Sequence, residues 1–172
     1  MPHLHVQQYQ KLPLIEKNRQ QAHIEDNFGH IPFVKQRQWA KPDMSVMLKQ
    51  KDELLAFFHI VLREVEFDGI TMPVAGLSNL ITAQQHQGKG YASILLTQGF
   101  TTLFNQLNVQ HSLLLCKDEL IPFYQKNHWY AIKAKLIFKQ KQGVETYRSN
   151  TLLLSTHTKL NPNHINLNGL PW

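Results

Sequence analysis

Gln87-Gly88-Lys89-Gly90-Tyr91-Ala92 is the stretch of this sequence that decides the fold. It stands between an apolar run typical of a strand, residues 74–82, and a run typical of a helix, residues 92–107. A glycine-rich turn that opens a helix offers unpartnered main-chain N–H groups to an anion, and the helix dipole adds to the attraction. The stretch is therefore a candidate phosphate site, although glycine also ends strands for purely conformational reasons.

A second segment, residues 113–129, combines a buried-looking strand with a short helix. Asp118 stands where a helix N-cap is expected, just after the apolar strand. Pro122 falls within the first turn, where its missing N–H costs little. We therefore expect a strand that leads directly into a helix carrying Phe123-Tyr124.

Together the two segments resemble the GNAT superfamily of acyl-CoA N-acyltransferases. The cofactor motif of that family is Gln or Arg, two variable residues, Gly, one variable residue, then Gly or Ala, and Gln87, Gly90 and Ala92 fill it. The later helix of the family commonly reads Phe-Tyr, three variable residues, glycine and an aromatic. Phe123-Tyr124 and Trp129 follow that spacing.

Two positions depart from the family pattern. Gln84 stands where many members have a proline before the cofactor turn, and His128 stands where a glycine usually precedes the aromatic. Neither change removes a group that holds the cofactor. Within the superfamily, residues 64–78 and the closing Gly169-Leu170-Pro171-Trp172 look most like the aminoglycoside N-acetyltransferases.

The resemblance implies an α+β (mixed α/β) fold, in which helices flank a mixed, mostly antiparallel central sheet that contains a β-α-β cofactor unit. It implies a single N-acetyltransferase domain over residues 1–172, with the cofactor core at about residues 74–130. Acetyl-CoA is the implied co-substrate, held by main-chain N–H groups of the turn and alongside the preceding strand. The cofactor-binding residues expected on this basis are Leu80, Ile81, Thr82, Gln87, Gly88, Lys89, Gly90, Tyr91, Ala92 and Ser93.

Candidate catalytic side chains are fewer. Tyr124 falls where the family places the general acid for the departing thiolate, and a phenol of pKa about 10 stays protonated at neutral pH until needed. The alternative is a helix tyrosine that packs its ring on the sheet. Glu64, Glu66 and Ser78 could relay the proton lost by the amine, or hold exposed and core-edge structural positions instead.

The function implied is acetyl transfer from acetyl-CoA to a primary amine of a small molecule or peptide, by direct attack on the thioester. Two alternatives stay open: an acyl-CoA-binding sensor or partner domain without turnover, and a basic nucleic-acid-binding module. The net charge is +6, but the basic residues are scattered and no run of five or more Lys/Arg occurs, which argues against a primary nucleic-acid role.

Composition narrows the remaining classes. With 42% hydrophobic and 17% charged residues, the chain is an ordinary globular sequence. The single cysteine, Cys116, excludes an internal disulfide and a cysteine-built zinc site, and the 10 histidines lack the spacing of a metal site, so no metal is expected. With no secretory signal and no long apolar run, we expect a soluble, cytoplasmic protein without a membrane partner. The oligomeric state is open, a homodimer included.

Hydrophobic patterns outline the remaining elements. Asp68-Gly69 is a strong hairpin signal that returns the chain into the strand before the cofactor turn. Strands are expected at residues 4–10, 45–48, 54–67, 74–82 and 113–116, helices at residues 14–27 and 92–107, and an antiparallel hairpin between residues 132–138 and 144–155.

Two segments are expected to be irregular. Residues 28–43 form a loop whose aromatic side chains either pin the connection to the core or line an acceptor pocket. The acceptor would be selected by this loop together with residues 139–145. Residues 156–172 form a docked tail, in which Ile165 and Leu167 can lie in an edge strand.

Overall fold

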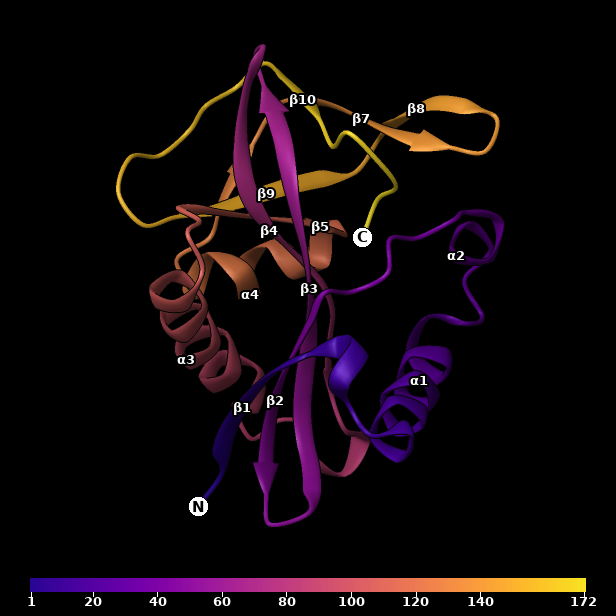
Figure 1. Cartoon of the computed structure of the whole chain (residues 1–172), viewed down its shortest axis with the longest axis vertical. Coiled ribbons are helices and arrows are strands. Elements are labelled where there is room, and N and C mark those ends of the chain that lie inside the picture. The colour runs from indigo at the N-terminus through magenta and orange to yellow at the C-terminus, as the bar shows by residue number, and fades with distance from the viewer.

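A ten-stranded sheet runs through the computed structural model, which describes residues 1–172 (Figure 1). Its main path has the strand order β6-β9-β5-β4-β3-β10-β7-β8, and β2 and then β1 extend from β3. Only the β4–β5 and β10–β7 pairs are parallel, which confirms the expected mixed, mostly antiparallel α+β fold. The strands are β1 (His3–Gln8), β2 (Met44–Gln50), β3 (Glu53–Phe67), β4 (Ile70–Thr82), β5 (His111–Cys116), β6 (Tyr130–Ile132), β7 (Lys135–Gln140), β8 (Gly143–Tyr147), β9 (Asn150–Ser155) and β10 (His164–Asn166).

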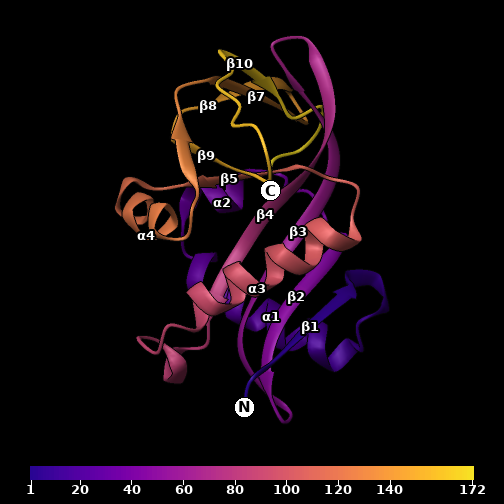
Figure 2. The same ribbon diagram turned by 90° about the vertical axis from the view of Figure 1, so that its left-hand side faces the viewer.

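Helices cover both faces of this sheet. The longer ones are α1 (Leu14–Phe28) and α3 (Tyr91–Gln106), and the shorter ones are α2 (Pro32–Gln36) and α4 (Ile121–Lys126). Figures 1 and 2 place α3 and α4 on one face and α1 and α2 on the other. None of the helices has the length and apolar character that crossing a membrane requires.

The apolar stripe of α3 explains why this helix lies on the sheet. Leu96, Phe100 and Leu103 recur at helical spacing, and all three are buried in the largest core cluster with residues of β2, β3 and β4. The ring of Phe100 stacks on that of Phe58 in β3 at 5.3 Å. On the opposite face, Met47, Phe57 and Ile81 form a smaller cluster beneath α1. Successive side chains of β2 and β3 point to opposite faces of the sheet, so these strands contribute to both clusters.

The β3–β4 hairpin turns where the sequence predicts it. Asp68 and Gly69 have φ values of 48° and 86°, the left-handed conformation that a two-residue hairpin turn requires. From this turn the two strands stay paired along almost their whole length, and β4 then runs parallel to β5 only from Val74 to Leu77.

A bulge interrupts β4 just beyond that point. His59 pairs with Ser78 and Phe57 pairs with Ile81, so β4 holds one residue more than β3 over this interval. Asn79 lies in the bulge with a φ of 54°. Asparagine tolerates the left-handed region better than most residues, which suits it to this position. The bulge and the end of the β5 ladder together open the sheet at this place.

Three expectations about local structure are corrected. The segment of residues 28–43 contains the helix α2, started by Pro32 in the first turn. Asp118 does not cap α4: it opens a separate 3₁₀ turn (Asp118–Leu120), and its carboxylate accepts a hydrogen bond from Asn150. The expected hairpin of residues 132–155 is split, because β7 pairs with β8 whereas β6 and β9 pair with each other.

The tail is docked, but its strand is not at an edge. Residues of β10 lie between β3 and β7, antiparallel to β3 and parallel to β7. Ile165 is buried in a second core cluster that also contains Phe138 and Trp172. The tail therefore completes the sheet rather than covering its rim.

Candidate active site

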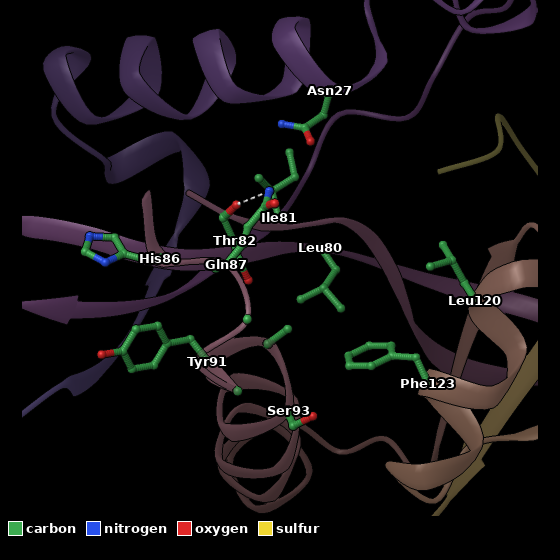
Figure 3. Close-up of a pocket in the computed structure, with 13 residues that line it drawn as sticks. Asn27, Leu80, Ile81, Thr82, His86, Gln87, Tyr91, Ser93, Leu120 and Phe123 are labelled. Carbon is green, nitrogen blue, oxygen red and sulfur yellow. Dashed lines mark hydrogen bonds between the residues drawn. The ribbon is translucent and has the colours of Figure 1, made fainter. Parts of the chain in front are cut away.

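A pocket of about 620 Å³ opens where β4 leaves β5 and α3 begins. Figure 3 shows Asn27 reaching toward it from the end of α1, with Leu120, just before α4, and Phe123, within α4, on the far side. Its walls come from α1, the end of β4, the glycine turn and the start of α4. The lining residues are Asn27, Leu80, Ile81, Thr82, His86, Gln87, Gly88, Gly90, Tyr91, Ala92, Ser93, Leu120 and Phe123.

The glycine turn presents a row of free main-chain donors. No main-chain N–H of residues 88–93 donates a hydrogen bond within the protein, and the first bond of α3 runs from Ile94 to the carbonyl of Gly90 at 3.1 Å. Gly88 and Gly90 have φ values of 76° and 78°, which lets the chain curl so tightly before the helix. Unpaired N–H groups at the positive end of a helix dipole form an anion-binding site.

Side chains hold the turn from outside. The Gln87 amide donates to the carbonyl of Thr82 at 3.3 Å, which ties the turn back to the end of β4 (Figure 3). The Lys89 ammonium donates to the carbonyl of Gln85 at 3.2 Å and does not line the pocket. To contact a phosphate in the pocket as predicted, the Lys89 side chain would have to leave the Gln85 carbonyl and adopt another rotamer.

The other wall is the irregular end of β4. Leu80, Ile81 and Thr82, all expected beside the acyl donor, do line the pocket. Leu80 packs toward the core beneath α3, whereas Ile81 is buried on the α1 side. Past Leu77 the strand has no β5 partner, so its main-chain groups on that edge are free for an extended ligand.

Tyr124 lies behind this pocket rather than in its wall. It is 6% exposed and packs edge-on against Phe123 and Trp129, while its neighbour Phe123 lines the pocket. Burial raises the pKa of Tyr124, and the nearby Cys116 thiol adds to the rise. The hydroxyl makes no hydrogen bond in the protein and is not among the fully enclosed unpaired polar atoms, so its oxygen retains some accessible surface.

The other two predicted catalytic residues are placed differently from one another. Ser78 directly precedes the bulge and faces His59 across the β3–β4 ladder. Glu66 pairs with Thr71 next to the hairpin turn, nine positions along β4 from Leu80 and thus roughly 30 Å away. Glu64, opposite Pro73, is likewise distant. The prediction that Glu66 serves the site is corrected, because strand register carries it to the other end of the sheet.

Several lining residues escaped sequence reasoning. Asn27 reaches the pocket from the last turn of α1, and His86 stands at the rim with its Nε2 2.7 Å from the Glu53 carboxylate. Leu120 and Phe123 contribute apolar surface. Phe123 belongs to the Phe-Tyr pair of the family pattern, but that pattern does not indicate that its side chain lines the pocket.

Comparison with known families identifies the chain. A family model described as "Acetyltransferase (GNAT) domain" matches residues 18–131, more than half of the chain. The protein therefore belongs to the GNAT acetyltransferase family, and it has the acetyl-CoA-binding fold of that family. A search of curated proteins found no match.

Solved structures share this fold. A GNAT family acetyltransferase from Brucella melitensis in complex with acetyl-CoA has a TM-score of 0.60 at 12% identity, over 95% of this chain and 94% of that chain. GNAT family N-acetyltransferase YhbS from Escherichia coli, in complex with CoA, has a TM-score of 0.62 at 11% identity, over 97% and 89%. Escherichia coli ElaA has a TM-score of 0.63 at 13% identity, over 89% and 99%.

Proposed function

We propose that this protein transfers an acetyl group from acetyl-CoA to a primary amine on a small molecule or peptide. The observation that carries the proposal is the run of unpaired N–H groups in residues 88–93, which lines the same pocket as the free edge of β4. The turn suits the diphosphate of the donor, and the edge of β4 suits its extended pantetheine arm. The similar Brucella and Escherichia proteins were solved with acetyl-CoA and with CoA.

The reaction joins two bond changes. The lone pair of the amine attacks the thioester carbonyl carbon, a C–N bond forms, and the C–S bond breaks with CoA leaving as a thiolate. Starting from the ammonium ion, the nitrogen loses one proton before it attacks and a second as the amide forms, while the thiolate takes up one. One proton is released overall, and no oxidant or reductant is needed. A main-chain N–H near Leu80 would polarise the thioester carbonyl, because such donors stabilise the charge that develops on oxygen.

Tyr124 is the proposed proton donor for the thiolate. Its raised pKa keeps the phenol protonated at neutral pH, and the burial that raises this pKa would also make a thiolate beside it more basic. After the transfer, the phenolate would recover a proton from solvent, to which the side chain is 6% exposed.

The proton that the ammonium group of the acceptor loses before attack must leave by another route. An alkylamine of pKa about 10.4 loses its proton at pH 7 at a cost of about 4–5 kcal/mol. No carboxylate lines the pocket, and its only histidine, His86, already contacts Glu53. We propose that water carries this proton past Ser78 to solvent.

Gly90→Ala tests the donor site. Gly90 requires a left-handed φ, so the substitution strains the turn and adds a methyl group beside the free N–H groups. Gly69→Ala is the matched control: its φ is similarly positive, its surroundings are equally open, and it lies at the β3–β4 turn. We expect CoA affinity, measured by calorimetry, to fall at least about tenfold in Gly90→Ala. In Gly69→Ala it should stay within about twofold.

Turnover separates the proposal from its alternatives. Purified protein is incubated with acetyl-CoA and primary amines (polyamines, lysine peptides and aminoglycosides), and free thiol is measured. Aminoglycosides are included to test whether the protein shares the substrates expected of the aminoglycoside N-acetyltransferases. Thiol release supports the proposal. CoA binding without turnover of any amine would favour the sensor alternative, and salt-sensitive nucleic-acid binding without CoA affinity would favour the nucleic-acid module.

A further inference from the structure

A chain of buried polar side chains connects α1 to the bulge in β4. Gln20 in α1 is 0% exposed and His59 in β3 is 1% exposed. The Gln20 Oε1 lies 2.8 Å from His59 Nε2 and also accepts a hydrogen bond from the Ser45 hydroxyl at 3.1 Å. On the other side of the imidazole ring, His59 Nδ1 lies 3.3 Å from the Asn79 amide nitrogen. Buried polar groups of this kind are costly unless they are paired.

The hydrogen bonds define the state of the imidazole. Because the Gln20 oxygen accepts, His59 Nε2 carries the proton, and Nδ1 offers its lone pair to the amide N–H of Asn79. Burial lowers the pKa of His59 to about 4, so the ring is neutral at physiological pH. A neutral ring that donates on one side and accepts on the other can orient both of its partners.

The last member of this hydrogen-bonded series, Asn79, belongs to the backbone segment that forms the pocket wall. Asn79 has the left-handed φ of 54° that shapes the bulge, and the next residue, Leu80, lines the pocket. Rotation of the Asn79 backbone would turn the following N–H away from its present direction. The amide of Asn79 is held only by His59, and His59 is held in turn by Gln20. The bulge is therefore fixed by a side-chain link to α1. This helix lies on the opposite face of the sheet from α3 (Figure 1).

We propose that His59 and Gln20 are positioning residues for acetyl transfer, which hold the Asn79 bulge so that the main-chain N–H beside Leu80 faces the thioester carbonyl. The inference rests on the proposed function, because it assigns the link to the step in which that carbonyl is polarised. It concerns groups that touch neither the acetyl group nor CoA. A packing role alone would affect stability but not the polarisation of a bound carbonyl.

The test compares His59→Phe with His111→Phe. His111 is also a buried histidine of the same sheet and bonds to Ser155 at 2.8 Å, but it pairs with Val74, away from the bulge. Asn79→Gly is a third variant, because glycine keeps the left-handed backbone while the amide link is lost. The probe is acetonyl-CoA with a ¹³C-labelled ketone, which presents a carbonyl but cannot transfer it. Its ¹³C chemical shift on binding reports how strongly the carbonyl is polarised.

We expect the ketone of acetonyl-CoA to move downfield on binding to the wild-type protein and to His111→Phe. In His59→Phe and Asn79→Gly at least about half of this shift should be lost, while acetonyl-CoA affinity changes less than about threefold. With acetyl-CoA and the best amine of the panel, kcat should fall at least about tenfold in His59→Phe without a matching rise in the KM for acetyl-CoA. If His59→Phe does not fold, Asn79→Gly gives the decision.

Different results would overturn the proposed function and the positioning role of His59 and Gln20. A wild-type protein that does not bind acetonyl-CoA would overturn the proposed function, and this inference with it. A wild-type protein that binds and shifts the ketone, but whose His59→Phe or Asn79→Gly variant shifts it equally, would overturn this inference alone. An equal loss of the shift in His111→Phe would also overturn it, since any buried histidine of the sheet would then have the same effect.

Discussion

The two halves of β4 differ in pairing, burial and surroundings. Residues 74–77 are paired with β3 on one side and β5 on the other, and all are buried. Residues 78–82 keep only β3, contain the Asn79 bulge and supply three lining residues of the pocket. One strand is thus core at its centre and binding surface at its end, and the change occurs where the β5 ladder stops.

The paired half is also sealed by the tail. The Trp172 ring lies against Gly76 so closely that any side chain there would overlap it, and the indole N–H donates to the Leu113 carbonyl at 3.2 Å. Arg63 covers the outer side of the ring at 5.3 Å. The open half has no such cover. The candidate acyl-donor pocket thus lies at the part of β4 that neither β5 nor the tail covers.

Trp172→Ala gives the largest expected effect and acts on the sealed half alone. Removing a large buried ring should lower the free energy of unfolding by about 3–5 kcal/mol, measured by denaturant titration. CoA affinity at a temperature where the variant is folded should stay within about threefold, because the pocket lies elsewhere on the strand. A loss of CoA affinity far beyond this would show that the two halves are not independent.

The pH dependence of stability gives the next effect, and it acts on the open half. His59 has a folded pKa of about 4 against an ordinary value of 6.5, so the unfolded chain takes up its proton first as pH falls. The stability that comes from keeping His59 neutral is fully present above about pH 6.5 and is lost toward pH 4. The loss amounts to about 3 kcal/mol in the free energy of unfolding. We expect the stability difference between the wild-type protein and His59→Phe to shrink by this amount from pH 7 to pH 4. A constant difference would contradict the buried neutral ring.

Local signals explain what the sequence predicted of the fold. The hairpin at Asp68-Gly69 and the glycine turn before α3 depend on residues close in the chain, and both were predicted correctly. The internal position of β10 depends instead on contacts with β3 and β7, which lie far away in sequence. The five residues of α2 are too few for a helical period to appear.

The site divides in the same way. A glycine turn fixes where the main-chain N–H groups lie, so the sequence indicates this part of the pocket wall, and the resemblance to the family adds residues 80–82. The side-chain part of the site depends on strand register. Glu66 was misplaced although the hairpin turn at residues 68–69 already implies that it pairs with Thr71. The link from His59 to Gln20 gave no sequence signal, because a histidine in an apolar strand does not reveal its partner in another element.

Tyr124→Phe tests whether acetyl transfer at the open half of β4 requires Tyr124 as a proton donor. The phenol is not in the pocket wall, so its loss should leave CoA affinity nearly unchanged. Turnover with the best amine of the panel should fall at least about tenfold, equal to about 1.4 kcal/mol or more. Phe123→Leu is a suitable comparison, since Phe123 does line the pocket and its change should alter the KM first. Equal turnover of wild-type protein and Tyr124→Phe would exclude the acid role.

Lys89→Ala gives the smallest effect and separates main-chain from side-chain binding in the open half. The Lys89 ammonium now bonds to the Gln85 carbonyl and is exposed to solvent, so its attraction for a diphosphate is that of a screened surface charge. We expect CoA affinity to fall about two- to fivefold at low salt and to match the wild-type value at high salt. Lys141→Ala, at the exposed turn between β7 and β8, should have no effect at either salt concentration. A loss as large as that of Gly90→Ala would mean that the lysine, rather than the unpaired N–H groups, holds the diphosphate.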